Sequence, residues 1–169
     1  MIKLLGTVLV VGSAGGFGLS KGIGFYSQIR TVRSFLAGLE ILKCEMNYTL
    51  SPLPKLCKTV AGRTSGPCST FFLDYADLIN ASLPRTLAAR RLLGDEKAYR
   101  LPKDARLCLL ELFESIGAYE LEGENRLLRT ASQRLKASLE HLEREKKPLA
   151  KSYAVLGLCL GLALAILFI

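Results

Sequence analysis

Hydrophobic residues dominate the two ends of the chain, whereas apolar and polar residues are interspersed throughout the middle. No charged residue occurs between Leu4 and Ser20 or between Ser152 and Ile169. Uncharged runs of about 17 residues approach the length that an α-helix needs to cross the hydrocarbon core of a bilayer. The pattern predicts an N-terminal transmembrane helix over residues 1–21, a helical domain over residues 25–147 and a C-terminal transmembrane helix over residues 150–169.

Glycines in both apolar ends have a spacing that favours helix packing in lipid. Gly12 and Gly16 form one GxxxG pair, and Gly157 and Gly161 form a second. Small residues four positions apart lie on one face of a helix and allow another helix backbone to approach closely. We therefore expect these four glycines to support packing between membrane helices.

The N-terminal run also permits an alternative interpretation as a cleaved secretory leader. Lys3 supplies a basic start, residues 4–11 an apolar core and residues 12–14 a small-residue cleavage site. In that case the chain would be a membrane-tethered binding module on the extracytoplasmic side. The apolar character continues through Phe17 and Leu19, which favours a retained span.

Apolar positions in the middle of the chain recur every three or four residues, which predicts helices. In the first of these helices, over residues 26–48, one stripe contains Ile29, Val32, Leu36 and Leu39. No useful strand alternation is present. The remaining helices are expected over residues 52–61, 67–79, 84–93, 102–116 and 120–147. The predicted fold class is all-α, a six-helix bundle flanked by the two transmembrane helices.

The last two predicted helices carry more detailed expectations. Leu107 belongs to the predicted apolar face of the fifth helix. Leucines at every seventh position from Leu121 to Leu142 give the sixth helix a heptad stripe, so it is expected to lie beside the first helix. Glu124 is expected on a solvated face, and Pro148 is expected to allow a fresh start into the membrane helix.

Charge is concentrated in the middle of the chain. The net charge is +8, and every charged residue except Lys3 lies between Lys21 and Lys151. Basic residues flank both apolar runs on the side of the bundle, which favours a cytoplasmic bundle, although the positive-inside rule weakens for a long connection. One segment is especially basic and contains Arg85, Arg90, Arg91, Lys97, Arg100, Lys103 and Arg106. It is interpreted either as a solvated surface or as a docking patch for an acidic partner or for lipid headgroups.

Residues that carry catalytic chemistry are scarce. The chain has one histidine, His141, and no GK[ST] phosphate loop, so neither a histidine relay nor a Walker nucleotide site is predicted. The cysteine count is five, with no CxxC pair, which favours buried thiols over a disulfide framework or a zinc site. We expect no catalytic residue, cofactor or metal, no enzyme activity and no nucleic-acid partner.

The sequence also resembles a known family. The opening residues 1–22, the stretch QIRTVRSFLAGLEILKCEMNYTLSPLPKL and the later LFESIG resemble the stage III sporulation protein AB family of endospore-forming bacteria. The most specific part is the stretch from Glu45 to Leu53, which contains Tyr48 and the Ser51-Pro52-Leu53 turn. The C-terminal apolar helix also matches, so the resemblance covers essentially the whole chain.

The resemblance implies a component of a secretion-like, trans-envelope channel complex between mother cell and forespore. It implies a fold similar to the cytoplasmic domain of the type II secretion inner-membrane F protein, a six-helix bundle. The expected partners are a secretion-type ATPase, other stage III sporulation membrane proteins, the membrane itself and a second copy in a homo-oligomer. The expected location is the mother-cell membrane around the forespore, with the bundle in the cytoplasm. The family implies no catalytic residues.

Overall fold

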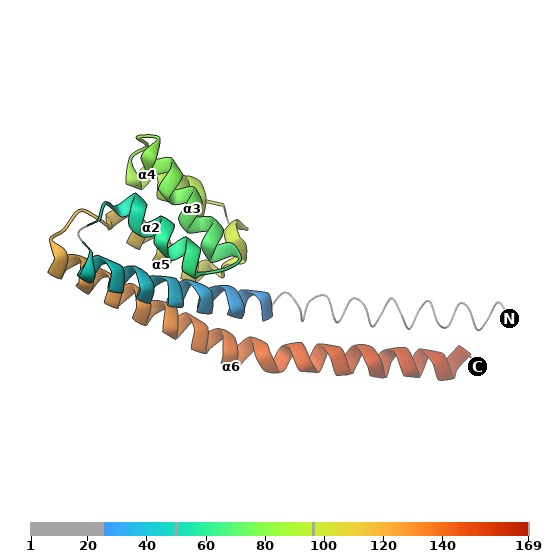
Figure 1. Ribbon diagram of the computed structural model, residues 1–169. Helices are drawn as coiled ribbons and strands as arrows, with labels where there is room; N and C mark the ends of the chain where they lie inside the picture. The colour runs from blue at the N-terminus through green and yellow to red at the C-terminus, as the bar shows by residue number, and fades with distance from the viewer. Residues whose placement is uncertain (1–25, 50, 96, 169) are drawn as a thin grey trace. The chain divides into compact units, whose positions relative to one another are not determined.

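A computed structural model of the chain describes residues 26–49, 51–95 and 97–168, with side chains up to residue 144 except at residue 98. The chain divides into two compact units. One covers residues Gln28–Glu140, and the described part of the other contains residues 26, 27 and 141–168. The first of these units, here called the bundle, contains most of the helices in Figure 1.

The described residues are helical throughout, apart from short connections. The helix over residues 26–48, here called the first helix, is followed by α2 (Leu53–Arg63), α3 (Pro67–Asn80), α4 (Arg85–Leu93), the short 3₁₀ helix η1 (Ala98–Arg100), α5 (Lys103–Ser115) and α6 (Leu121–Phe168). No strand occurs among these residues. The prediction of an all-α fold with six α-helices is confirmed.

Prolines mark the starts of four helices. Pro52, Pro84 and Pro102 immediately precede α2, α4 and α5, and Pro67 is the first residue of α3. A proline suits these positions because its fixed φ fits a helix start, where its missing N–H leaves no hydrogen bond unmade. The helix α6 instead remains continuous through Pro148, where the sequence predicted a fresh start.

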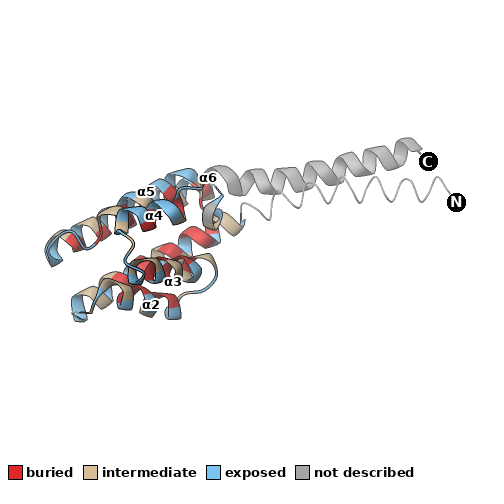
Figure 2. Ribbon diagram, turned by 90° about the horizontal axis from the view of Figure 1, so that it is seen from above, coloured by how far each residue is buried: buried red, intermediate tan, exposed pale blue. Residues whose placement is uncertain are grey.

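Aromatic side chains fill the centre of the bundle. Phe71, Phe72 and Tyr75 of α3 are fully buried and pack around Phe113 of α5, with ring centroids 4.7 to 5.6 Å from it. The rings meet mostly edge to face, the geometry that their quadrupoles favour. The Tyr75 hydroxyl donates a hydrogen bond of 2.7 Å to the Phe113 carbonyl, which satisfies the only polar atom of that side chain. In Figure 2 the buried positions face one another across the helices.

The first helix approaches α3 closely because it carries Gly38 at the crossing. A Cβ atom at Gly38 would lie 3.0 Å from the Cys68 sulfur and 3.0 Å from a ring carbon of Phe72. Phe35, one turn before Gly38, packs 5.5 Å from Phe71 between ring centroids. The glycine therefore allows the first helix to contribute directly to the aromatic centre.

Within the bundle, the first helix and the part of α6 up to residue 140 lie side by side and run antiparallel (Figure 1). Their register is set by reciprocal amide hydrogen bonds between Asn47 and Asn125, of 3.0 and 2.8 Å. The prediction that these helices pack together is confirmed, and Leu128 and Leu135 of the heptad stripe are buried.

Two residues of the predicted apolar faces are instead largely exposed. Leu121 is 46% exposed and Leu107 is 40% exposed, so the prediction of their burial is wrong. Leu121 lies in the first turn of α6, and the face of α5 that packs inward carries Leu109, Leu112 and Phe113.

Within the described residues, no helix combines the length and hydrophobicity needed to cross a membrane. The predicted span over residues 1–21 lies outside the described residues, and so do Gly12 and Gly16. Over residues 150–168 the structure describes a helical backbone but no side chains, so the predicted role of Gly157 and Gly161 also lies outside the described part.

Candidate interaction surface

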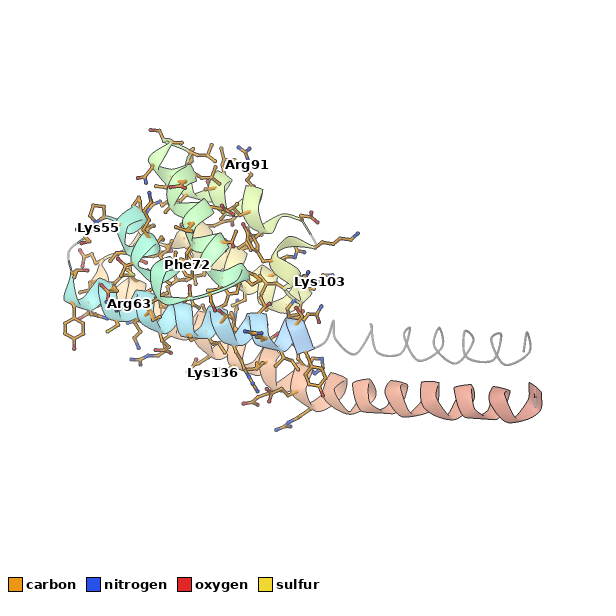
Figure 3. The ribbon with its side chains drawn as sticks, turned by 45° about the vertical axis from the view of Figure 1, so that its right-hand side comes forward. Lys55, Arg63, Phe72, Arg91, Lys103 and Lys136 are labelled. Atoms are coloured by element: carbon orange, nitrogen blue, oxygen red, sulfur yellow. The ribbon has the colours of Figure 1, made fainter. Side chains whose placement is uncertain are left out.

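The seven basic residues predicted as a docking patch fall into two groups in the structure. Three of them bind other parts of the bundle: Arg85, Arg90 and Arg106. The other four are exposed and form no side-chain hydrogen bond or ion pair within the described part of the chain: Arg91, Lys97, Arg100 and Lys103. Figure 3 shows Arg91 beside α4 and Lys103 at the start of α5.

Arg106 is buried between α5 and α4, with 7% of its surface exposed. Its Nη1 atom donates hydrogen bonds to the Leu93 carbonyl at 2.7 Å and to the Gly94 carbonyl at 3.1 Å. Carbonyls at the C-terminus of a helix lack intrahelical partners and carry the negative end of the helix dipole, so a guanidinium stabilises them. Arg106 therefore joins α5 to the end of α4 and cannot belong to an exposed patch.

Arg85 and Glu124 both bind the backbone of the turn between α5 and α6. Arg85 donates a hydrogen bond of 3.0 Å from Nη1 to the Ile116 carbonyl. The Glu124 carboxylate accepts hydrogen bonds from the Gly117 and Tyr119 backbone N–H groups, at 2.7 and 3.0 Å. The turn requires glycine at position 117, where φ is +80° and a Cβ atom would overlap the Arg85 guanidinium.

Glu124 is only 3% exposed, so the prediction that it lies on a solvated face is wrong. Its carboxylate satisfies backbone donors of the turn, and it lies within the first turn of α6, where the helix dipole favours negative charge. A glutamate as the fourth residue of a helix, close to the position that carries it in a capping box, is the sequence signal that could have indicated this role.

Arg90 forms an ion pair with Glu114 of α5, with Nε and Oε1 2.5 Å apart. The hydrogen bond from Arg90 to this carboxylate raises the pKa of the arginine. Because the Arg90 side chain is 68% exposed, the pair contributes little to stability, but it neutralises Arg90. Among the seven basic residues, the exposed charges without an ion pair in the described part of the chain are those of Arg91, Lys97, Arg100 and Lys103.

The segment over residues 97–103, here called the cationic loop, contains three of those four residues. Two side chains anchor it to the bundle. The Tyr99 hydroxyl donates a hydrogen bond of 3.0 Å to Asp74 of α3, and the Tyr99 ring packs edge-on against Phe71 at 5.5 Å between centroids. Leu101 is 3% exposed.

Exposed cations alternate with these anchors at Lys97, Arg100 and Lys103. Tyr99 and Arg100 both adopt left-handed backbone conformations, with φ of 52° and 56°. Such conformations cost free energy in residues with a Cβ and persist only where surrounding contacts impose them. The half-buried Tyr99 and the buried Leu101 therefore hold the cations outward.

A shallow groove of about 390 Å³ separates α5 from α6 on another side of the bundle. Each helix contributes four positions with helical spacing, from Cys108 to Ser115 on α5 and from Leu127 to Arg134 on α6. The Arg134–Glu111 ion pair, at 2.6 Å, crosses it. The groove carries no unpaired charge that would indicate a ligand.

The thiols of the bundle are mostly buried, as the sequence predicted. Burial raises the pKa of Cys57 to about 12 and that of Cys68 to about 11, and it also raises the pKa of Cys108. Cys44 is the exposed exception among the described cysteines. Across the described residues, no cluster of histidine, cysteine or acidic side chains is placed to hold a metal ion.

Comparison with known proteins assigns the family. The sequence profile of stage III sporulation protein AB matches residues 3–169, which is nearly the whole chain. The chain belongs to the stage III sporulation protein AB family. The resemblance read from the Glu45–Leu53 stretch and the apolar ends is therefore confirmed, and a role related to sporulation follows from membership.

A solved structure supports the fold of this family member. The chain is similar to a structure named stage III sporulation protein AB (SpoIIIAB), with a TM-score of 0.64 and 22% sequence identity. The similarity covers 72% of this chain and 98% of the solved one. At this identity the comparison shows the shared helical fold. A comparison with curated proteins gave no match.

Proposed function

We propose that this chain is a membrane-anchored structural component of the sporulation machinery and serves as a platform for other subunits. The observation that carries the proposal is the family match over residues 3–169. The uncharged runs at both ends of the sequence support anchoring, because they have the composition of membrane helices. The bundle supports a platform role, because its helices are tied together by buried hydrogen bonds at fixed positions.

In this proposal the complex is a secretion-like channel between mother cell and forespore. The bundle faces the mother-cell cytoplasm and contacts a secretion-type ATPase and other stage III membrane proteins. Subunits would be held by surface complementarity, and no chemical step on this chain is required. These partners follow from the family resemblance.

Arg91 of α4 is the best candidate for the contact with an acidic partner. It is exposed and has no ion pair among the described residues, whereas its neighbour Arg90 is neutralised by Glu114. An unpaired exposed arginine can form a bidentate pair with a partner carboxylate without first breaking an internal contact.

The platform role is tested by purifying the tagged full-length chain from sporulating cells after a carbonate wash of the membranes. We expect the chain to remain in the membrane fraction and the ATPase to purify with it. Release of the chain by carbonate would contradict anchoring. Retention of the chain without the ATPase or any stage III membrane protein would contradict the platform.

The contact surface is tested in the same purification by Arg91→Glu. We expect the yield of the ATPase to fall, because charge reversal places a carboxylate against an acidic partner. Lys136→Glu on α6 is the matched control, since Lys136 is also exposed and unpaired among the described residues (Figure 3). Equal loss with both variants would assign the effect to net charge, and no loss with Arg91→Glu would exclude this contact.

A further inference from the structure

We propose that the cationic loop docks onto anionic lipid headgroups, so that one end of the bundle rests on the membrane surface. This inference rests on the proposed function, because it requires a chain that is anchored in the bilayer. It assigns Lys97, Arg100 and Lys103 to a lipid contact and leaves Arg91 for a protein partner.

The hydrogen bonds of the bundle distinguish its two ends. One end, here called the turn end, contains the Asn47–Asn125 pair and the α5–α6 turn at Gly117. From that pair, the first helix runs back to residue 28 and α6 runs forward to residue 140, in the same direction. Both chain connections out of the bundle therefore leave from the opposite end, here called the junction end.

The cationic loop lies at the junction end. The helix α5 begins at Lys103 and reaches the α5–α6 turn only after its last residue, Ser115. At a rise of about 1.5 Å per residue, Lys103 therefore lies about 18 Å along α5 from the turn end. Figures 1 and 3 agree with this placement, since the start of α5 and the labelled Lys103 lie towards the start of the first helix.

Along the chain, the predicted membrane spans adjoin the residues at which the chain enters and leaves the bundle. Residue 28 follows the span over residues 1–21 by seven positions, and residue 140 precedes the span over residues 150–169 by ten. Attraction of basic side chains to anionic lipid acts within a Debye length, about 8 Å at physiological salt. Seven to ten helical residues span about 10 to 15 Å, somewhat beyond that range, so docking requires the cationic end of the bundle to incline towards the membrane surface.

The loop presents its charges in a fixed arrangement suited to a surface. Tyr99 and Leu101 are anchored in the bundle, so the exposed cations between and beside them are held outward without a folding cost at contact. Three acidic residues flank the loop: Asp95 and Asp104 have local structural roles, and Glu96 lies outside the described residues. Asp95 accepts the Lys97 backbone N–H at 2.9 Å, and Asp104 lies in the first turn of α5, where it complements the helix dipole.

The test places a fluorophore beside the loop in the full-length protein. The background carries Cys44→Ser and Cys159→Ser, because Cys44 is exposed and Cys159 lies in the C-terminal run. Leu107→Cys puts the label one turn from Lys103 on the same face of α5, and Tyr48→Cys puts a matched label at the turn end, where Tyr48 is 85% exposed. Vesicles contain a spin-labelled headgroup tracer in phosphatidylcholine, with or without roughly 30% phosphatidylglycerol, a fraction typical of anionic surfaces.

We expect phosphatidylglycerol to increase quenching at position 107 and not at position 48. Each cation near an anionic surface changes the equilibrium constant for docking about fivefold. Joint replacement of Lys97, Arg100 and Lys103 by glutamine should therefore lower this constant about 100-fold. Lys55→Gln is the matched control, because α2 begins at the turn end, where Leu53 lies near Gly117. This variant should leave the quenching unchanged.

The outcomes separate this inference from the proposed function. Equal quenching at position 107 in both vesicle types, or quenching that survives the triple replacement, would overturn lipid docking and leave an acidic protein as the partner of the loop. If carbonate still fails to extract the chain from those vesicles, membrane anchoring stands without lipid docking. Extraction by carbonate would instead contradict the anchoring on which both depend.

Discussion

Replacing Arg106 by methionine tests whether this arginine is structural, although it belongs to the most basic segment of the sequence. Methionine keeps an unbranched stem and removes the guanidinium, so the carbonyls of Leu93 and Gly94 lose their donor. Arg91→Met is the matched control, because Arg91 is exposed and forms no ion pair among the described residues.

The expected loss follows from the two hydrogen bonds. A hydrogen bond with a charged donor contributes about 1.5 to 3 kcal/mol when it is buried, as the bond to Leu93 is. The bond to Gly94 is only partly buried, and water can replace it, so we assign it about 1 kcal/mol. Removing a buried charge that has no carboxylate partner among the described residues also relieves desolvation, which offsets part of the loss. We expect a net decrease of about 2 kcal/mol in the free energy of unfolding.

The measurement is urea unfolding of the full-length protein in detergent, followed by far-UV circular dichroism. With a slope of about 2 kcal/mol per molar urea, Arg106→Met should lower the midpoint by about 1 M. Arg91→Met should change the free energy of unfolding by less than about 0.5 kcal/mol. If the two variants unfold at the same urea concentration, the contact between Arg106 and the end of α4 does not stabilise the bundle. The assignment of Arg106 as structural and of Arg91 as available to a partner would then be wrong.

Four further predictions concern the core, the α5–α6 turn and the thiols. Tyr75→Phe removes one buried hydrogen bond and should lower the free energy of unfolding by about 1 kcal/mol in the same assay; an unchanged midpoint would show that this bond is dispensable. Gly117→Ala forces a Cβ atom into a left-handed position against the Arg85 guanidinium and should cost about 1 to 3 kcal/mol, whereas Gly62→Ala, which meets open space, should cost nothing. Maleimide should label Cys44 and not Cys57 in the native protein at pH 8, because burial raises the pKa of Cys57 to about 12. Between pH 9 and this raised pKa, the unfolded chain has lost the Cys57 proton and the folded chain retains it. The free energy of unfolding should therefore fall as the pH rises over this range, and it should fall less in a Cys57→Ala variant.

The periodicity of apolar residues was sufficient to predict the helices, because each one packs a stripe against its neighbours. The prolines before α2, α4 and α5 indicated their starts, since proline is best tolerated at the start of a helix. Pro148 within α6 is an exception. The burial of individual residues was harder to predict. Leu107 and Leu121 fit the helical stripes, yet they are exposed, because hydrophobicity indicates a preference for burial and not the presence of a neighbouring helix.

The basic residues of the candidate surface show even more clearly that the surroundings of a single residue are hard to predict from sequence. Counting charges along the chain gave Arg85, Arg91 and Arg106 the same weight, but a guanidinium and the carbonyls it binds can be far apart in sequence. Arg85 reaches Ile116, which is 31 positions away, and Glu124 reaches back to the Gly117 turn. No local pattern reveals such pairs, because they form only when α4, α5 and α6 pack together.

Sequence alone therefore determined the helical class, the apolar ends and the family of this chain, since all three depend on residue type and on spacing along the chain. Tertiary structure decided which cations are structural and which are exposed, and it placed the exposed loop at the end of the bundle from which both chain connections leave. The physical reason is that the surroundings of a charge are set by packing between distant segments, and those surroundings decide whether the charge holds the fold together or faces a partner.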